Sequence, residues 1–324
     1  MSALVRFVDA GLEGLDIILD RFHRRQGVIG ALLLSPSLII LGVFAFFPLL
    51  YAIYISLFDT RRGIYNGAGN YLRAFNEPEF WRSVKVTFYY AIGTVPLSLA
   101  ISFTIAWLLF RIVFARSFFR TLYFLPYVTS AVASATVWRA LLRPQSGLIN
   151  LLLINIGIEP QKWLIEPRGV LNILTDGMIP PAIGPSLALC CIIAFDIWHA
   201  SGFMIVVFLA GLSSIPKQLE EGARLDGAST WQVIRHVSLP LLSPTIFFLL
   251  IVSAIKSFQS FNSFYALVSA PGDDTQNLIV YIYAQFYQNQ RIGYGAAVAV
   301  LMCAAIVLLT IVQWRFVGRK VHYE

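Results

Sequence analysis

Residues 215–244 read IPKQLEEGARLDGASTWQVIRHVSLPLLSP, and this polar stretch separates two long apolar runs. It combines charged side chains with helical spacing, because Glu220, Glu221 and Arg224 lie within one turn of each other. Asp226-Gly227 interrupts the pattern, since aspartate can cap a helix and glycine can turn the chain. We therefore expect two short helices, joined at Asp226-Gly227 and held beneath a helical bundle.

Apolar side chains accompany both expected helices. They are Leu219, Ala223, Leu225 and Ala228 on the first, and Trp231, Ile234 and Val237 on the second. A projecting helix with such a face suits a groove on a cytoplasmic partner. The alternative is an elbow on the membrane surface that has no protein partner.

The apolar runs on either side of this stretch belong to a set of six. Each holds roughly 20 or more mostly apolar residues, enough for a helix to cross a hydrocarbon core about 30 Å thick. The expected spans are Val28–Leu57, Val86–Phe110, Phe118–Leu142, Ser186–Leu212, Pro244–Val268 and Gly295–Val317. Because backbone groups in lipid must pair internally, these runs predict helices. The fold class is therefore all-α: a polytopic membrane bundle over residues 28–324, with a cytoplasmic loop at 213–243.

Composition agrees with a membrane protein, because 58% of the 324 residues are apolar and only 13% are charged. Soluble domains carry about 25% charged residues, which argues against an ordinary soluble enzyme. The net charge of +7 is read as a sign of topology and not of a nucleic-acid partner. With both termini on one side, thirteen Lys and Arg fall on that side and nine on the other. The positive-inside rule then places both termini in the cytoplasm.

Residues 1–27, which precede the first span, carry apolar and acidic positions on separate faces. The apolar positions are Val8, Leu12, Leu15, Leu19 and Phe22, and the acidic ones are Asp9, Glu13, Asp16 and Asp20. Spacings of three and four residues predict an amphipathic helix. Such a helix lies on the membrane, on a partner or on its own chain, and the pattern leaves these alternatives open.

Two charged residues lie deep in the expected spans, where charges are costly and often functional. Asp196 is in the fourth span and Lys256 is in the fifth. One interpretation is a buried ion pair that fixes helix register, and the other is the polar lining of a solute pathway. Helical spacing supports a lining, because each charge shares a face with other candidate residues. These residues are His199 and Phe203 beside Asp196, and Gln259, Ser260 and Ser263 beside Lys256.

The stretch 215–244 resembles the EAA loop of ABC importer permeases. That pattern is Glu-Ala-Ala, then three residues, then a glycine, with Ile-x-Leu-Pro further on. The matching positions here are Glu221, Gly222, Ala223, Asp226, Gly227, Ala228, Val237, Leu239 and Pro240. Gly222 replaces the middle alanine and Val237 replaces the isoleucine. Glycine costs roughly 1 kcal/mol of helix propensity relative to alanine, so the resemblance implies a looser coupling helix.

Other motifs resemble the carbohydrate-uptake branch of the same family, over about residues 30–324. They are Asn70-Tyr71 with Pro78-Glu79-Phe80-Trp81, Arg120 with Phe124-Leu125-Pro126, Trp138 with Gly147-Leu148-Ile149-Asn150, and Gly293-Tyr294-Gly295-Ala296-Ala297. The resemblance is to the first membrane subunit of the maltose and glycerol-3-phosphate importers. It implies the type I ABC importer permease architecture in the plasma (inner) membrane of a prokaryote.

The resemblance also implies partners. Such a subunit forms half of a translocation pore with a second homologous permease, and works with two ATPase subunits and an external solute-binding protein. The ATPase-coupling residues implied are Glu220, Glu221, Gly222, Ala223, Arg224, Asp226, Gly227 and Ala228. The sequence holds no phosphate-binding loop of the G-x-x-x-x-G-K-[ST] kind. We therefore expect ATP and magnesium on the ATPase subunits and no cofactor on this chain.

In the first permease of the maltose importer, the solute contacts come from the same two spans. The matching positions are His199, Ala200, Phe203, Lys256, Gln259, Ser260 and Ser263, and Asp196 joins them through its place in the fourth span. The side chains differ almost throughout from those of that importer. The solute class therefore stays open among sugars, oligosaccharides, polyol glycosides and glycerol phosphate.

Two other classes of membrane protein fit the sequence less well. An ion-coupled secondary transporter would use Asp196 and Lys256 as ion sites, but it predicts inverted repeats and leaves residues 215–244 unexplained. A membrane-embedded enzyme would show paired carboxylates, a metal cluster or a nucleophile motif. The sequence has none of these; its three Cys lie inside apolar runs with no C-x-x-C pair, and its four His are scattered. We expect no catalytic residues and no metal site.

Overall fold

The computed structural model describes residues 29–111, 116–166, 168–175, 177–180, 184–268 and 275–321. The chain divides into two units, Met1–Ile55 and Ser56–Glu324, which are described separately. The amphipathic segment predicted at 1–27, and the domain boundary after it, lie outside the described residues. The one described sheet is a hairpin of β1 (Phe58–Asp59) and β2 (Ile64–Tyr65). The remaining regular elements of the described chain are helical, which confirms the all-α fold class.

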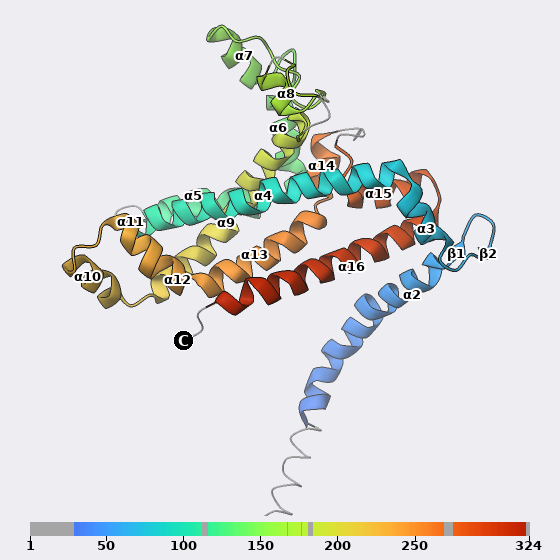
Figure 1. Cartoon of the computed structure of the whole chain (residues 1–324), viewed down its shortest axis with the longest axis horizontal. Coiled ribbons are helices and arrows are strands. Elements are labelled where there is room, and N and C mark those ends of the chain that lie inside the picture. Colours follow the sequence, from blue (N-terminus) through green and yellow to red (C-terminus); the bar gives the residue numbers. More distant parts are fainter. Residues whose placement is uncertain are drawn as a thin grey trace, which may run out of the picture. The chain divides into compact units, whose positions relative to one another are not determined.

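Four of the described helices are long and apolar enough to cross a bilayer. They are Ile29–Ser56, which includes the π-helix η1 (Gly42–Phe46) and α2 (Phe47–Ser56), and then α4 (Pro78–Arg111), α9 (Leu187–Ser214) and α16 (Ile292–Phe316) (Figure 1). They correspond to the first, second, fourth and sixth predicted spans. The α4 helix is longer than predicted, since its 34 residues extend about 51 Å and exceed the hydrocarbon core.

The third and fifth predicted spans each consist of two helices and not of one continuous helix. The third span divides into α5 (Arg116–Val128) and α6 (Ala131–Leu141), and the fifth divides into α13 (Ser243–Phe258) and α14 (Asn262–Leu267). At the first break, the Thr129 hydroxyl donates to the Pro126 carbonyl at 2.7 Å and competes with the helical backbone bond. At the second, the side-chain amide of Asn277 donates to the Ser260 carbonyl at 2.7 Å.

The polar stretch forms the predicted pair of helices. The first helix is α10 (Lys217–Leu225), and the second begins with α11 (Thr230–Val233) and continues through the π-helix η2 (Ile234–Ser238) into α12 (Leu239–Leu241). The segment Thr230–Leu241 meets α13 at an angle of 69°, beside Pro240 and Pro244. Proline removes a backbone donor and disfavours continuous helix, which explains a bend at this place. If this bent pair counts as one span, the described residues hold up to five.

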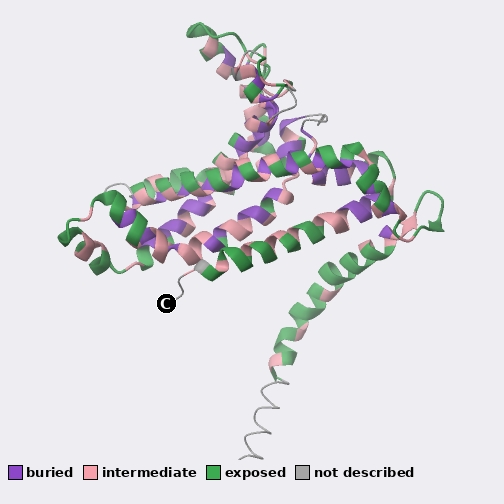
Figure 2. Cartoon of the chain, viewed as in Figure 1, coloured by how far each residue is buried: buried purple, intermediate pink, exposed green. Residues whose placement is uncertain are grey.

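The second unit is built around the contact of α4 with α9, and α13 packs against both. A Cβ added at Gly202 of α9 would lie 2.5 Å from the Tyr123 carbonyl oxygen, so glycine permits a close approach of α5. Figure 2 shows buried residues gathered on α9 and at the start of α16, whereas the helix Ile29–Ser56 is exposed along nearly all of its length. Exposed apolar side chains of this kind are what a bilayer requires.

The two ends of the long helices carry different elements. The helices α10 and α11 lie at one end of the α4, α9 and α13 group, and α3 (Gly69–Asn76) and α15 (Leu278–Tyr283) lie at the other (Figure 1). The π-helix η3 (Ala284–Gln288) follows α15, and the short helix η4 (Gly318–Lys320) follows α16. Arg291 forms a salt bridge with Glu77 at 3.3 Å and ties the start of α16 to the turn between α3 and α4.

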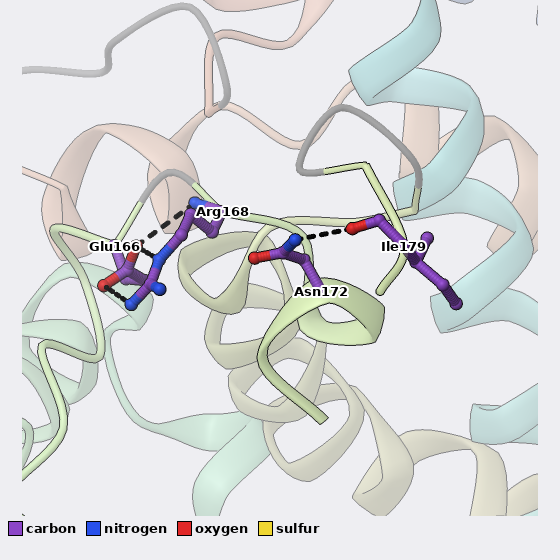
Figure 3. Close-up of polar contacts among 4 residues, drawn as sticks. All are labelled: Glu166, Arg168, Asn172 and Ile179. Atoms are coloured by element: carbon purple, nitrogen blue, oxygen red, sulfur yellow. Dashed lines mark hydrogen bonds and ion pairs between the residues drawn. The ribbon is translucent and has the colours of Figure 1, made fainter. Parts of the chain in front are cut away.

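Residues 143–185 contain the short helix predicted at 148–156, which is observed as α7 (Leu148–Asn155), and a second helix, α8 (Val170–Leu174). Polar contacts organise the segment around α8 (Figure 3). Arg168 Nε donates to Glu166 Oε1 at 2.7 Å, and this hydrogen bond holds the pKa of the Glu166 carboxyl below its usual value. Asn172 donates from its side-chain amide to the Ile179 carbonyl. These contacts give local order to a segment with little regular structure.

Candidate functional site

A cleft of about 330 Å³ lies between α4, the break from α5 to α6, α9 and the break from α13 to α14. Its lining includes Asp196, His199, Ala200, Lys256, Gln259, Ser260 and Ser263, which are all but one of the residues predicted for the solute pathway. The remaining one, Phe203, has its ring centroid 5.2 Å from Lys256 Nζ. The structure therefore brings residues of two separate spans together at one place. Their role in solute passage stays a prediction.

Asp196 is half-buried on α9 and accepts hydrogen bonds from the hydroxyl groups of three residues. Ser263 Oγ donates to Oδ1 at 2.6 Å, while the Tyr90 hydroxyl donates to Oδ2 at 2.5 Å and Ser260 Oγ does so at 3.4 Å. Hydrogen bonds to charged groups contribute about 1.5–3 kcal/mol each. Because the three donors come from α4 and from the region after α13, Asp196 joins three segments of the chain.

Lys256 borders the same cleft but makes a different set of contacts. Among the residues that the structure describes, no salt bridge within 4.0 Å joins Lys256 to Asp196. Its Nζ lies 5.2 Å from the ring centroid of Phe203 and 5.6 Å from that of Tyr127. Both distances suit cation–π contacts, worth about 0.5–1 kcal/mol at accessible sites. The buried ion pair, one of the two interpretations of these charges, is therefore not present in the described chain.

Two of the rings that line the cleft, those of Tyr127 and His199, stack on rings beside it. Tyr127 of α5 stacks on Phe203 with ring centroids 5.4 Å apart, and the ring of His199 stacks on Phe195 at 5.7 Å. His199 Nε2 lies 3.3 Å from the Thr129 carbonyl oxygen, at the break after α5. His199 therefore has a partner within the chain, as an interior histidine usually does.

The sequence interpretation missed the contribution of α4 to the cleft. Tyr90, Thr94 and Ser98 line it, and Tyr127 and Ala131 join them from the break between α5 and α6. A signal for the α4 residues exists in the sequence, because polar positions recur every three or four residues through this apolar span. They are Ser83, Thr87, Tyr90, Thr94, Ser98 and Ser102, and all of them are buried. Such a stripe marks one inward-facing side of a helix.

The predicted coupling residues lie on and just after α10, none of whose residues is buried. Glu221 and Asp226 are exposed, and 89% of the Leu225 side chain is accessible. Gly227 has a φ of +82°, and the Ala228 amide donates to the Ala223 carbonyl at 3.0 Å, which is a typical glycine-terminated helix end. The apolar face expected on α10 is thus uncovered in this chain.

The second helix of the polar stretch begins at a different residue from the one expected. Asp226 ends α10, and Ser229 is the N-cap of α11. The backbone N–H of Gln232 donates to the Ser229 side-chain oxygen, and the backbone N–H of Ser229 donates to Gln232 Oε1 at 2.7 Å. This reciprocal capping box satisfies two backbone donors at the helix start. Trp231 then projects outward, with 65% of its side chain exposed, so it does not continue a buried stripe.

Comparisons with known proteins assign the family. Residues 43–322 match the family described as the binding-protein-dependent transport system inner membrane component. The chain belongs to this family. It is 33% identical over 298 residues to a probable ABC transporter permease protein of Pyrococcus horikoshii, covering 89% of this chain and 96% of that protein. The resemblance to ABC importer permeases is therefore confirmed, and this permease is a multi-pass protein of the inner membrane.

Two further relatives have solutes in their names. The permease is 28% identical to the sn-glycerol-3-phosphate transport system permease protein of Agrobacterium fabrum, covering 90% of this chain and 95% of that one. It is 29% identical to the trehalose/maltose transport system permease protein of Thermococcus litoralis, and the match covers 93% of this chain and 97% of that protein. The same fold is found in the crystal structure of a bacterial ABC transporter involved in the import of the acidic polysaccharide alginate. The TM-score is 0.75 at 22% identity, and the match covers 91% of this chain and 96% of that one.

Proposed function

We propose that this permease forms half of the pathway of an ATP-driven importer for a sugar or a sugar-like solute. The observation that carries the proposal is the cleft between α4, α5, α9 and α13. Sugars need hydrogen-bonding groups beside an aromatic surface. Gln259 and Ser260 supply the hydrogen-bonding groups, and Tyr127, which stacks on Phe203, supplies the aromatic surface. Relatives named for glycerol phosphate and for trehalose and maltose support this solute class.

The cleft lies at a suitable depth for alternating access. Lys256 is 13 residues beyond Ser243, the first residue of α13, which corresponds to about 20 Å along the helix. If Ser243 lies at the membrane boundary, a core about 30 Å thick would hold the cleft well inside the membrane. A second homologous permease would complete the pathway, and an external solute-binding protein would deliver the solute. Rigid-body movement of the two permeases would then expose the cleft to each side in turn.

We further propose that α10 docks in a groove of an ATPase subunit. Glu221 and Asp226 are exposed beside the accessible Leu225, and a charged face with an uncovered apolar side chain suits a protein partner. Two such subunits would hold ATP and magnesium, and this chain would hold neither. If α10 docks in the cytoplasm, the six spans predicted from the sequence would put both termini there as well, because four of them precede α10 and two follow it.

The coupling proposal is tested on the assembled complex, produced together with its second permease, ATPase and binding protein. Glu221→Arg reverses an exposed charge, and we expect at least a tenfold loss of the ATP hydrolysis that solute-loaded binding protein stimulates. The ATPase retained during purification should fall as well. Glu79→Arg is the matched control, since it reverses an exposed charge at the other end of the bundle. Equal ATPase retention in both variants would argue against docking through α10.

Solute transport is tested with the same complex in sealed vesicles. ATP-dependent uptake of at least one sugar or sugar phosphate is expected, and it should require this permease. Uptake that proceeds without the ATPase and follows an ion gradient would contradict the proposal and favour a secondary transporter.

A further inference from the structure

The cleft contains two opposite charges, Asp196 and Lys256, which have different partners within the chain. The Asp196 carboxylate is occupied on both oxygens by hydroxyl donors of this chain. Lys256 has no such counterpart, because Asp196 is the one carboxylate among the residues described as lining the cleft, and no salt bridge within 4.0 Å joins the two. The two charges therefore do not neutralise each other by direct contact.

The donors to Asp196 also come from fixed positions. Tyr90 is 2% exposed on α4 and Ser263 is 5% exposed on α14, so both hydroxyls are held by packing. Ser260 Oγ lies 3.1 Å from Ser263 Oγ and 3.1 Å from the Tyr90 hydroxyl oxygen, so the three donors also contact one another. A solute that enters the cleft finds this carboxylate already engaged. Asp196 is consequently a positioning residue for the broken span.

The ammonium group of Lys256 is available to a solute in a way that Asp196 is not. Its side chain is exposed, and its described neighbours are the faces of Phe203 and Tyr127. Aromatic faces attract a cation but leave its hydrogen-bond donors without acceptors. The strongest partner for such a group is a carboxylate or a phosphate. Gln259, at the end of α13, adds an amide on the same rim of the cleft.

We infer that Lys256 binds an anionic group of the transported solute, a carboxylate or a phosphate, while the ring of Tyr127 covers the apolar face of the solute. This inference rests on the proposed function and narrows the solute from sugars in general to acidic sugars and sugar or polyol phosphates. A neutral sugar would leave the Lys256 ammonium without an ionic partner in the cleft.

The test uses the complete importer with its binding protein, in phosphatidylcholine vesicles, and measures ATP-dependent uptake. The anionic probes are sn-glycerol 3-phosphate and galacturonate, and their neutral counterparts are glycerol and galactose, with maltose as a neutral disaccharide. We expect at least tenfold faster uptake of one anionic probe than of its neutral counterpart. The two anionic probes distinguish a phosphate from a carboxylate.

Lys256 variants then connect the preference to this residue. Lys256→Met keeps the apolar stem and removes the charge, and it should lower uptake of the anionic probe at least tenfold. Lys256→Arg keeps the charge and should stay within threefold of the unaltered importer. Thermal unfolding of the complex should not change in either variant, which separates solute binding from assembly.

Three results would overturn the inference. Uptake confined to neutral probes would do so while leaving the proposed sugar importer intact. If Lys256→Met lowered the unfolding midpoint of the complex as well as uptake, Lys256 would be assigned to assembly. Its partner could then be a carboxylate of the second permease. Absence of ATP-driven uptake for every probe would overturn the inference together with the proposed function.

Discussion

The loop that contains α10 and α11 and the cleft beside Asp196 both contain charged side chains. They differ in whether these side chains have partners within this chain. In the loop, Glu221 and Asp226 are exposed, and the apolar Leu225 is uncovered beside them. In the cleft, Asp196 accepts from hydroxyl groups of two other segments. The loop thus leaves its charged and apolar side chains uncovered within this chain, whereas the Asp196 carboxylate in the cleft is engaged within the fold. Lys256 is the exception in the cleft.

The largest expected effect is on stability, and it should appear in the cleft alone. Asp196→Ala removes the acceptor of three hydroxyl groups and leaves buried donors unsatisfied, at about 1–3 kcal/mol for each. We expect the thermal unfolding midpoint of the solubilised complex to fall by several degrees, with less complex recovered. Asp226→Ala is the control in the loop, where an exposed aspartate is removed. A comparable loss of stability in the control would break the contrast between the two regions.

The next effect concerns the shape of the loop. Gly227 has a φ of +82°, a conformation that costs about 1–2 kcal/mol for a residue with a Cβ and more for a β-branched one. Gly227→Val should therefore reduce ATPase retention and stimulated hydrolysis several-fold without changing the unfolding midpoint of the complex. Asparagine tolerates the left-handed region, so Gly227→Asn should keep most of the coupling. If valine and asparagine gave the same coupling, the turn at Gly227 would not matter for docking.

The smallest effect is expected at Gly222 in the middle of α10. A Cβ at this position meets nothing within 4 Å, so Gly222→Ala adds helix propensity of about 1 kcal/mol without a clash. We expect backbone amides of α10 to exchange with solvent about fivefold more slowly, measured by hydrogen exchange on the complex. Ala223→Gly changes the next residue in the reverse direction and should speed the exchange. Equal exchange in both variants would show that α10 is ordered by its partner and not by its own propensity.

Hydropathy and spacing predicted most of the fold. The long helices were predicted in their correct places, because a run of apolar residues has few alternatives to helix in a bilayer. The pair of helices at 217–241 was predicted from charge spacing and from Asp226-Gly227. Spacing failed where side chains interrupt the helices. The break after α13 involves Asn277, 17 residues beyond Ser260, and periodicity within one span contains no information about such a contact.

The candidate site was predicted in part. The residues of the fourth and fifth predicted spans were found because a charge in an apolar run is conspicuous, and all of them except Phe203 line the cleft. The polar stripe of α4 was missed, although Tyr90, Thr94 and Ser98 recur at intervals of four. Hydroxyl groups are only weakly polar on a hydropathy scale, so they differ less from their apolar neighbours than Asp196 and Lys256 do.

The sequence by itself determined the membrane-spanning helices, the exposed coupling loop and the membership of its residues in a known pattern, because each depends on local composition and short spacings. Only the tertiary structure decided how the two charges in the spans are used. Tyr90 and Asp196 are separated by 106 positions, yet they form a hydrogen bond of 2.5 Å. Hydrogen bonds and cation–π contacts act over a few ångströms, so the packing of α4, α5, α9 and α13 decides which groups are satisfied within the chain and which remain available to a solute.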